Sequence, residues 1–220
     1  MRIDLHLHTS GSWDSLSDPE AVLRRALDRG LDRIAITDHN SVEVALAMAA
    51  RHPERVVVGE EVRTAEGIDV IGLYLSNAIP KGTPARETCL RIREQGGIVY
   101  LPHPYARGKG GSGALAEALA PLLDVVEVFN ARLLSRERNE KAVELARNHG
   151  LLRGAGSDAH TLAEVGGTWV ELPSHANTPA ALIEALASAE VHAKAAHPVV
   201  FLGSNLAKVR KALGGRGRAE

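Results

Sequence analysis

Cysteine and aromatic residues are both scarce in this 220-residue chain. The single cysteine, Cys89, cannot form an internal disulfide. This count excludes disulfide frameworks and thiolate zinc clusters, and it fits a reducing compartment. Phe, Trp and Tyr make up only 3% of the residues, so Leu, Val, Ile and Ala must build the core. This composition fits helices packed on strands better than a surface that stacks nucleic-acid bases.

The chain also lacks an excess of positive or negative charge, and it lacks a long apolar run. Its formal net charge is −1, so nothing attracts it globally to nucleic acid or to an anionic membrane. We expect no membrane association and no stable binding of duplex DNA. Residues 1–8 (MRIDLHLH) carry charged and imidazole side chains where a signal peptide needs an apolar stretch. We therefore expect a cytoplasmic protein.

Short β-branched runs alternate with amphipathic stretches along the whole chain. The runs that predict strands cover residues 2–8, 34–37, 55–61, 68–75, 98–101, 125–129, 151–158 and 167–172. The stretches that predict helices include residues 18–30, 42–50, 84–96, 114–123 and 135–149, with a basic final helix that Asn205 can cap. Strands followed by helices indicate βαβ units and a parallel sheet of seven or eight strands. We predict a single α/β domain, a closed or nearly closed barrel with its reactive groups at the carboxyl ends of the strands.

Imidazoles and carboxylates cluster at the ends of six predicted strands. These residues are Asp4, His6, His8, Asp38, His39, Glu60, Glu61, Asp69, His103, Asp158 and His160. Residues two apart on a strand face the same side, so His6 and His8 can share one ion. Imidazoles mixed with carboxylates suit Mn²⁺, Zn²⁺ or Fe²⁺ better than Ca²⁺ or Mg²⁺. The donors exceed the needs of one tetrahedral ion, which predicts two or three divalent metal ions bridged by a carboxylate.

Five ordered motifs resemble the PHP (polymerase and histidinol phosphatase) superfamily of metal-dependent phosphoesterases. They are D-L-H-x-H at 4–8, T-D-H at 37–39, G-x-E at 59–61, P-H-P at 102–104 and G-S-D-A-H at 156–160. The resemblance implies a distorted (β/α)7 barrel. The resemblance is strongest to stand-alone members of the superfamily that carry a PHP-associated C-terminal segment. It predicts a catalytic barrel over residues 1–189 and such a segment over 190–220, packed on the same domain.

The resemblance also implies three metal sites. The first would be held by His6, His8, Glu61 and Asp158, and Glu61 would bridge to a second ion also bound by His103. Asp14, His39 and His160 would hold a third. The chain departs from many relatives at Asp69, where they carry a histidine; an aspartate can still be a ligand of the second ion. We expect the three-metal state to be the active one.

These ligands predict an in-line attack on phosphorus by a hydroxide bound to the ions. His39 or His160 could protonate the leaving group, and Asp158 belongs with them in the catalytic set. Asp4 and Asp38 are expected to orient imidazole N–H groups. Residues expected to bind the substrate phosphate are Arg107 and Lys109, in a glycine-rich stretch, and Asn130 and Arg132, after the sixth strand.

The predicted function is hydrolysis of a phosphate ester of a nucleotide, a short oligonucleotide or a small phosphorylated metabolite. A metal-dependent amidohydrolase is one alternative, because that class also begins with H-x-H on a barrel strand. No strand-end lysine of the kind that class commonly uses to bridge its metals is present. A non-catalytic, metal-stabilised regulatory module is a second alternative, and the nearly complete set of ligands argues against it.

Overall fold

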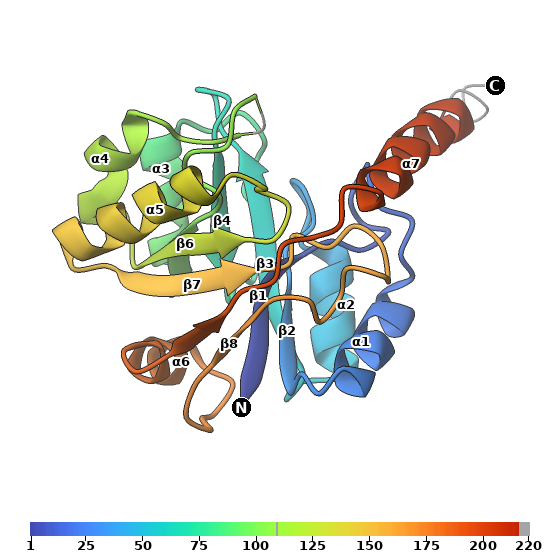
Figure 1. Cartoon of the computed structure of the whole chain (residues 1–220), viewed down its shortest axis with the longest axis horizontal. Helices are drawn as coiled ribbons and strands as arrows, with labels where there is room; N and C mark the ends of the chain where they lie inside the picture. The colour runs from blue at the N-terminus through green and yellow to red at the C-terminus, as the bar shows by residue number, and fades with distance from the viewer. Residues whose placement is uncertain (109, 216–220) are drawn as a thin grey trace.

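The computed structural model describes residues 1–108 and 110–215, and its centre is one curved sheet of nine strands. The strands are β1 (Arg2–Leu7), β2 (Arg33–Ile36), β3 (Val56–Arg63), β4 (Asp69–Leu73), β5 (Ile98–Leu101), β6 (Val125–Asn130), β7 (Leu152–Gly156), β8 (Trp169–Glu171) and β9 (Glu190–His192). Helices pack on the outside of the sheet, which curves into a nearly closed barrel (Figure 1). The predicted α/β class and distorted barrel are confirmed.

The sheet is mixed, so the prediction of a parallel sheet was wrong in part. Its order is β7-β6-β5-β4-β3-β2-β1-β8-β9. Strand β4 runs antiparallel to both β3 and β5, and β8 and β9 are antiparallel additions beside β1. The tight turn at Glu66 and Gly67, where Gly67 has a φ of 76°, explains β4, because two strands joined by so short a connection must be antiparallel.

Seven α-helices and one 3-10 turn are formed by the described residues. They are α1 (Pro19–Asp28), α2 (Glu43–Arg51), α3 (Ala85–Glu94), α4 (Leu115–Leu119), η1 (Ala120–Leu122), α5 (Arg136–His149), α6 (Pro179–Leu186) and α7 (Val200–Gly215). Helix α1 starts as expected, because Asp18 accepts a hydrogen bond from the Ala21 amide at 2.9 Å. The predicted helix over 114–123 is split, since Pro121 lies within η1. Asn205 lies inside α7, so the prediction that it caps this helix was wrong.

The two ends of the strand series meet where β1 approaches β7. The Asp158 amide donates to the His6 carbonyl at 2.8 Å, and the His8 amide donates to the Ala159 carbonyl at 2.9 Å. Below them the Asp4 carboxylate accepts hydrogen bonds from the amide and hydroxyl of Ser157. These bonds join residues about 150 positions apart in sequence and nearly close the barrel.

Helix α7 packs on the barrel through one face only. Ser204 and Ala207 are buried on the inner face, whereas Leu202, Leu206 and Val209 are exposed. The Lys211 ammonium donates to the Ser10 and Ser12 carbonyls and ties the helix to the loop after β1. In Figure 1 the far end of α7 projects from the body.

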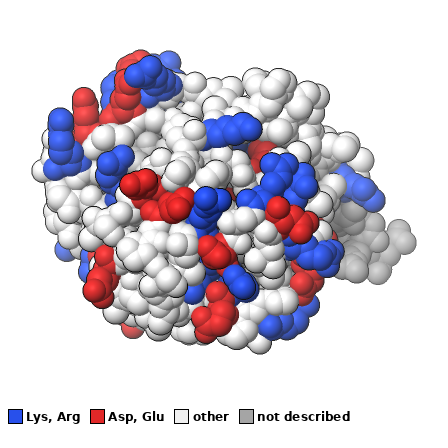
Figure 2. All heavy atoms as spheres, turned by 60° about the horizontal axis from the view of Figure 1, so that its bottom comes forward, with Lys and Arg blue, Asp and Glu red and all other residues white. Residues whose placement is uncertain are grey.

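Surface charge is mixed, as the near-zero net charge predicts. Figure 2 shows lysine and arginine side chains interspersed with aspartate and glutamate on one face of the molecule. Among the described residues, every helix is too short or too polar to cross a bilayer.

Candidate metal centre

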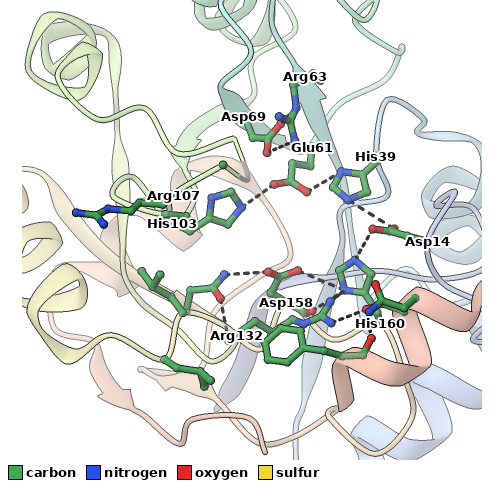
Figure 3. Close-up of a pocket in the computed structure, with 18 of the residues that line it drawn as sticks. Asp14, His39, Glu61, Arg63, Asp69, His103, Arg107, Arg132, Asp158 and His160 are labelled. Carbon is green, nitrogen blue, oxygen red and sulfur yellow. Dashed lines mark hydrogen bonds and ion pairs between the residues drawn. The ribbon is translucent and has the colours of Figure 1, made fainter. Parts of the chain in front are cut away.

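The predicted ligands converge on one pocket of about 860 Å³ at the carboxyl ends of the strands (Figure 3). Seven of the nine line it, namely Asp14, His39, Glu61, Asp69, His103, Asp158 and His160. The other two, His6 and His8, are buried and lie against Glu61 and Asp158. Residues from the ends of six strands and from the loop after β1 therefore meet at one place, as the sequence predicts.

Glu61 is the centre of this group. One of its oxygens, Oε2, lies 2.9 Å from His39 Nδ1, 3.4 Å from His8 Nε2 and 3.5 Å from His6 Nε2. The other, Oε1, lies 2.9 Å from His103 Nε2. A carboxylate with imidazoles on both of its oxygens has the arrangement that a bridging ligand requires.

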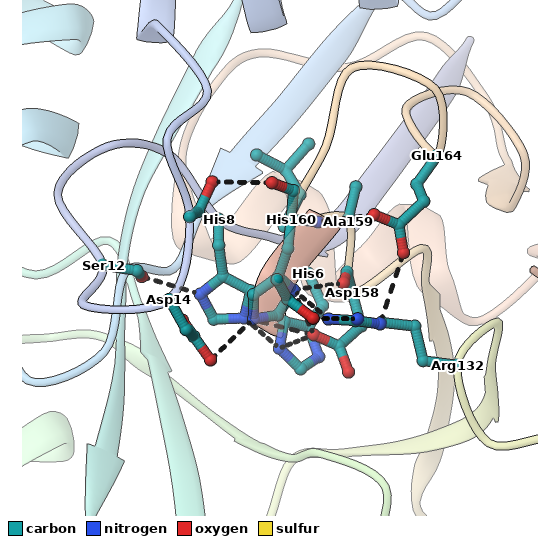
Figure 4. Close-up of polar contacts among 12 residues, drawn as sticks. His6, His8, Ser12, Asp14, Arg132, Asp158, Ala159, His160 and Glu164 are labelled. Atoms are coloured by element: carbon teal, nitrogen blue, oxygen red, sulfur yellow. Dashed lines mark hydrogen bonds and ion pairs between the residues drawn. The ribbon is translucent and has the colours of Figure 1, made fainter. Parts of the chain in front are cut away.

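Two smaller groups complete the donor set. Asp158 Oδ1 lies 3.3 Å from His8 Nε2 and 3.4 Å from His160 Nδ1. Asp14 lies between His39 and His160, with its oxygens 3.6 Å and 3.2 Å from their Nε2 atoms. Figure 4 shows Asp14 and Asp158 on either side of His8 and His160.

These residues fit divalent ions. Three triads place one donor atom from each member within 4.8 Å of the others: His8, His39 and His160; His6, His8 and Asp158; and His6, Glu61 and His103. The Nε2 atoms of His6 and His8 face each other at 3.2 Å. Asp14 Oδ1, Glu61 Oε2 and His103 Nδ1 are buried and make no hydrogen bond of good geometry. The two carboxylate oxygens lie against His39, at 3.6 Å and 2.9 Å from its ring nitrogens, and a cation between them and the imidazoles would satisfy them more fully.

The pKa shifts favour the ligand forms of the carboxylates Asp14, Glu61 and Asp158 and of His8, but they oppose those of His6, His39 and His103, whose pKa values are raised. Burial opposes ionisation of Glu61, but His39 and His6 hold the pKa of this carboxyl well below its usual range. Burial lowers the pKa of His8 to about 3, so this imidazole is neutral at pH 7. Burial also lowers the pKa of His39, but Glu61 and Asp14 outweigh it and raise the pKa to about 10. His39 must therefore lose a proton before it can bind an ion, and metal affinity should rise with pH.

Two of the ligands have a strained backbone. Asp158 has a φ of 49° and His103 a φ of 27°, in the left-handed region that non-glycine residues rarely occupy. The Asp158 amide is held by the His6 carbonyl at 2.8 Å. The His103 amide donates to Glu127 at 2.7 Å. Strain of this kind concentrates at functional sites.

Glu127 was missed by the sequence analysis. This buried carboxylate, from the middle of β6, accepts hydrogen bonds from His6 Nδ1 at 3.0 Å and from the His103 amide. The prediction that Asp4 and Asp38 orient imidazoles directly was wrong. Asp4 accepts from backbone amides and Ser157, and Asp38 reaches His8 only through Ser12, whose hydroxyl lies 3.0 Å from His8 Nδ1. The sequence signal that could have identified Glu127 is the one acidic residue inside the apolar run VVEVF at 125–129.

The predicted phosphate-binding residues have different surroundings. Arg107 lines the pocket, and Lys109 lies outside the described residues. The Asn130 amide donates to Glu127 at 2.9 Å, so it supports the ligands. Arg132 lies 2.6 Å from His160 Nδ1, and Glu164 pairs with it at 3.3 Å. Phosphate binding by these residues stays a prediction.

Asp69 is in the pocket but is paired with an arginine. Its carboxylate lies 2.6 Å and 3.0 Å from Nε and Nη2 of Arg63, the residue directly opposite on β3. It belongs to none of the three triads. Its Oδ1 is the oxygen that lies 2.6 Å from Arg63 Nε, so an ion would have to compete with this ion pair, and ligation by Asp69 stays a prediction.

The fold and the donor set define a barrel protein with a polar pocket whose residues could hold divalent ions. A family model described as PHP domain matches residues 4–152, and one described as PHP-associated matches residues 136–191. The chain belongs to the PHP family, which includes metal-dependent phosphoesterases. The PHP-associated model matches residues 136–191, whereas the predicted segment covers residues 190–220. The predicted boundary between residues 189 and 190 stays a prediction.

Two relatives come from Methanocaldococcus jannaschii. Uncharacterized protein MJ1587 is 40% identical over 145 residues, which cover 60% of this chain and 82% of that protein. Uncharacterized protein MJ0417 is 36% identical over 176 residues, which cover 78% of this chain and 70% of that protein.

Solved structures share the fold at low identity. PsfC from Pseudomonas syringae superposes with a TM-score of 0.68 and 20% identity, covering 96% of this chain and 98% of that chain. The lesion-specific endonuclease PfuEndoQ from Pyrococcus furiosus gives a TM-score of 0.65 and 14% identity, covering 87% of this chain and 58% of that one. At these identities the likeness supports the fold alone.

Proposed function

We propose that this protein is a metal-dependent phosphoesterase that hydrolyses the phosphate ester of a nucleotide, a short oligonucleotide or a small phosphorylated metabolite. The observation that carries the proposal is the convergence of five imidazoles and three carboxylates, from strands at both ends of the chain, on one pocket. Membership of the PHP family supports the same reaction class.

The donor set supports the three metal sites that the resemblance implies. His6, His8, Glu61 and Asp158 would hold one ion, and Glu61 with His103 a second. Asp14, His39 and His160 would hold a third. When bound, Mn²⁺, Zn²⁺ or Fe²⁺ ions would supply an activated water and positive charge for the phosphoryl oxygens.

The protein's own residues supply the proton and the remaining positive charge. Of the five imidazoles, His39 is the most open to the pocket, with 13% of its side chain exposed against 8% or less for the others. When it is not bound to the third ion, His39 is therefore the group best placed to give a proton to the leaving oxygen, with His160 as the second candidate under the same condition. Arg132 is fixed beside His160 by Glu164 and Ser204, where its charge can stabilise a phosphoryl oxygen.

The test is manganese-dependent phosphate release from a panel of esters. The panel contains nucleoside monophosphates, 3′,5′-bisphosphates, short oligonucleotides and histidinol phosphate. His8→Ala and Asp158→Ala should each abolish turnover, because each removes a ligand from the first site. His52→Ala is the matched control, since this histidine pairs with Glu20 away from the pocket and its loss should leave turnover unchanged.

Three results would contradict the proposal. Full activity in either ligand variant would refute the metal assignment. Hydrolysis of amides in place of esters would favour an amidohydrolase. If the wild-type protein binds metal, measured by elemental analysis, and hydrolyses none of the esters, a regulatory module would be favoured. Circular dichroism of each variant shows whether a loss of activity arises from unfolding.

A further inference from the structure

The mouth of the pocket has a different chemistry from its floor. The mostly buried imidazoles and carboxylates form its floor, whereas the more exposed side chains of Trp13, Leu133, Leu134 and Phe201 form the rest of its lining, here called the mouth. A phosphate group alone would occupy a small part of about 860 Å³, a volume typical of sites for much larger ligands. The substrate should therefore carry a sizeable body beyond its phosphate, and part of that body should be apolar.

Trp13 is the most unusual residue of this mouth. The chain has only two tryptophans, and Trp13 is 54% exposed. An exposed indole contributes little to a core, and burying it against an apolar partner is favourable. The other tryptophan, Trp169, is partly buried and stacks on His192 with ring planes 8° apart. Packing thus accounts for Trp169 but leaves much of the Trp13 ring facing water.

The contacts of its two neighbours in the chain fix the position of Trp13. Its neighbour Asp14 contacts His160 at 3.2 Å, and its other neighbour, Ser12, donates to Asp38 at 2.8 Å. The Trp13 ring lies 6.1 Å from the His39 ring, centroid to centroid, and Lys208 lies over it at 4.8 Å. The indole is therefore held at a set distance from the place where the phosphate would bind. A platform held in this way loses little conformational freedom when a ligand stacks on it.

The charges of the mouth agree with an anionic ligand. Arg107, Arg138 and Lys208 line the pocket around its outer part. An aromatic ring together with cations is the combination that binds a nucleotide. A base that stacks on the face of Trp13 now covered by Lys208 would displace this ammonium, which would then be available to pair with a phosphate oxygen.

We infer that Trp13 is a stacking platform for the base of a nucleoside phosphate whose phosphate ester lies over the metal ligands. This inference rests on the proposed function and narrows its substrate class. Trp13 acts as a specificity residue here and takes no part in bond cleavage. A ribose phosphate without a base should gain nothing from it.

The experiment compares adenosine 5′-monophosphate with ribose 5-phosphate, which carries the same ester without the base. In Trp13→Leu the KM for the nucleotide should rise roughly tenfold, within the range for the loss of one base–aromatic stack. The KM for ribose 5-phosphate and both kcat values should stay unchanged. Trp13→Phe should restore most of the nucleotide KM, and Trp169→Phe is the matched control.

A binding measurement tests the stack without turnover. In the zinc-loaded Trp169→Phe protein, Trp13 is the only tryptophan, so its fluorescence reports on the pocket mouth alone. Adenosine should quench this fluorescence, and ribose should not.

The outcomes separate the two proposals. Quenching by adenosine without hydrolysis of any ester would support the platform and refute the proposed function. Hydrolysis of both esters with equal KM changes in Trp13→Leu, or with none, would overturn the platform and leave the proposed function standing. Absence of quenching would also overturn the platform.

Discussion

Glu127→Gln should weaken divalent metal binding by about ten- to a hundredfold, although Glu127 is not itself a predicted ligand. The carboxylate accepts from His6 Nδ1 at 3.0 Å, which leaves the His6 Nε2 lone pair for an ion. It also accepts from the His103 amide at 2.7 Å, which fixes the strained backbone of that ligand. One side chain thus orients two of the proposed ligands.

The magnitude follows from the hydrogen bonds that a glutamine can keep. Besides His6 and His103, Tyr100 and Asn130 donate to the same carboxylate, at 3.2 Å and 2.9 Å. Glutamine offers one acceptor oxygen and turns an NH₂ group toward the remaining donors. At least one buried donor then loses its partner, at a cost of about 1–3 kcal/mol to the free energy of unfolding. A weakening of metal binding by ten- to a hundredfold corresponds to about 1.4–2.7 kcal/mol.

The assay is a competition titration of Zn²⁺ against a chelating dye, combined with urea unfolding of the metal-free protein. Glu171→Gln is the matched control, because its carboxylate is exposed and pairs with Arg2 at the surface. Glu171→Gln should change neither the Zn²⁺ affinity nor the free energy of unfolding. Wild-type metal affinity in a correctly folded Glu127→Gln protein would refute the idea that this carboxylate orients the ligands.

Two further changes test the buried surroundings of the site. Burial raises the pKa of Glu60 to about 7, against the opposing hydrogen bond from the Ile79 amide, so the native state binds this proton more tightly than the unfolded chain. Its favourable contribution is complete below about pH 4.5 and is lost as the pH rises through 7. Glu60→Gln should therefore be the more stable protein at pH 8, by at most about 3 kcal/mol, with the gap closing toward pH 4.5 in urea unfolding at each pH. Gly156→Ala should lose about 1–3 kcal/mol, because its Cβ would lie 2.3 Å from His6 Cβ and 2.6 Å from Glu127 Oε1; an unchanged urea midpoint would contradict this packing.

The positions of the ligands could be predicted from the sequence because the apolar runs show where each strand ends. The alternation in residues 2–8 places His6 and His8 on one face, and the structure confirms that they face one another. Parallel strands bring their carboxyl ends together, so Glu61, His103 and Asp158 meet in the pocket without any contact that the sequence could show.

The partners of these ligands were harder to predict, because they depend on register and on long-range packing. The turn at Glu66 and Gly67 places Arg63 opposite Asp69, so this pair could have been read from the hairpin. The contact between Arg132 and Ser204 on α7 could not, because nothing in the sequence fixes how the last helix crosses the barrel.

The meeting of β1 with β7 gives a bound ion a second consequence. His6 lies in β1 and His8 directly after it, whereas Asp158 and His160 come about 150 residues later, and few backbone hydrogen bonds join the two segments. A metal ion bound by residues of both segments would hold them together. Metal binding and closure of the barrel between β1 and β7 would therefore be thermodynamically linked. Chelation should therefore loosen the molecule first between these two strands.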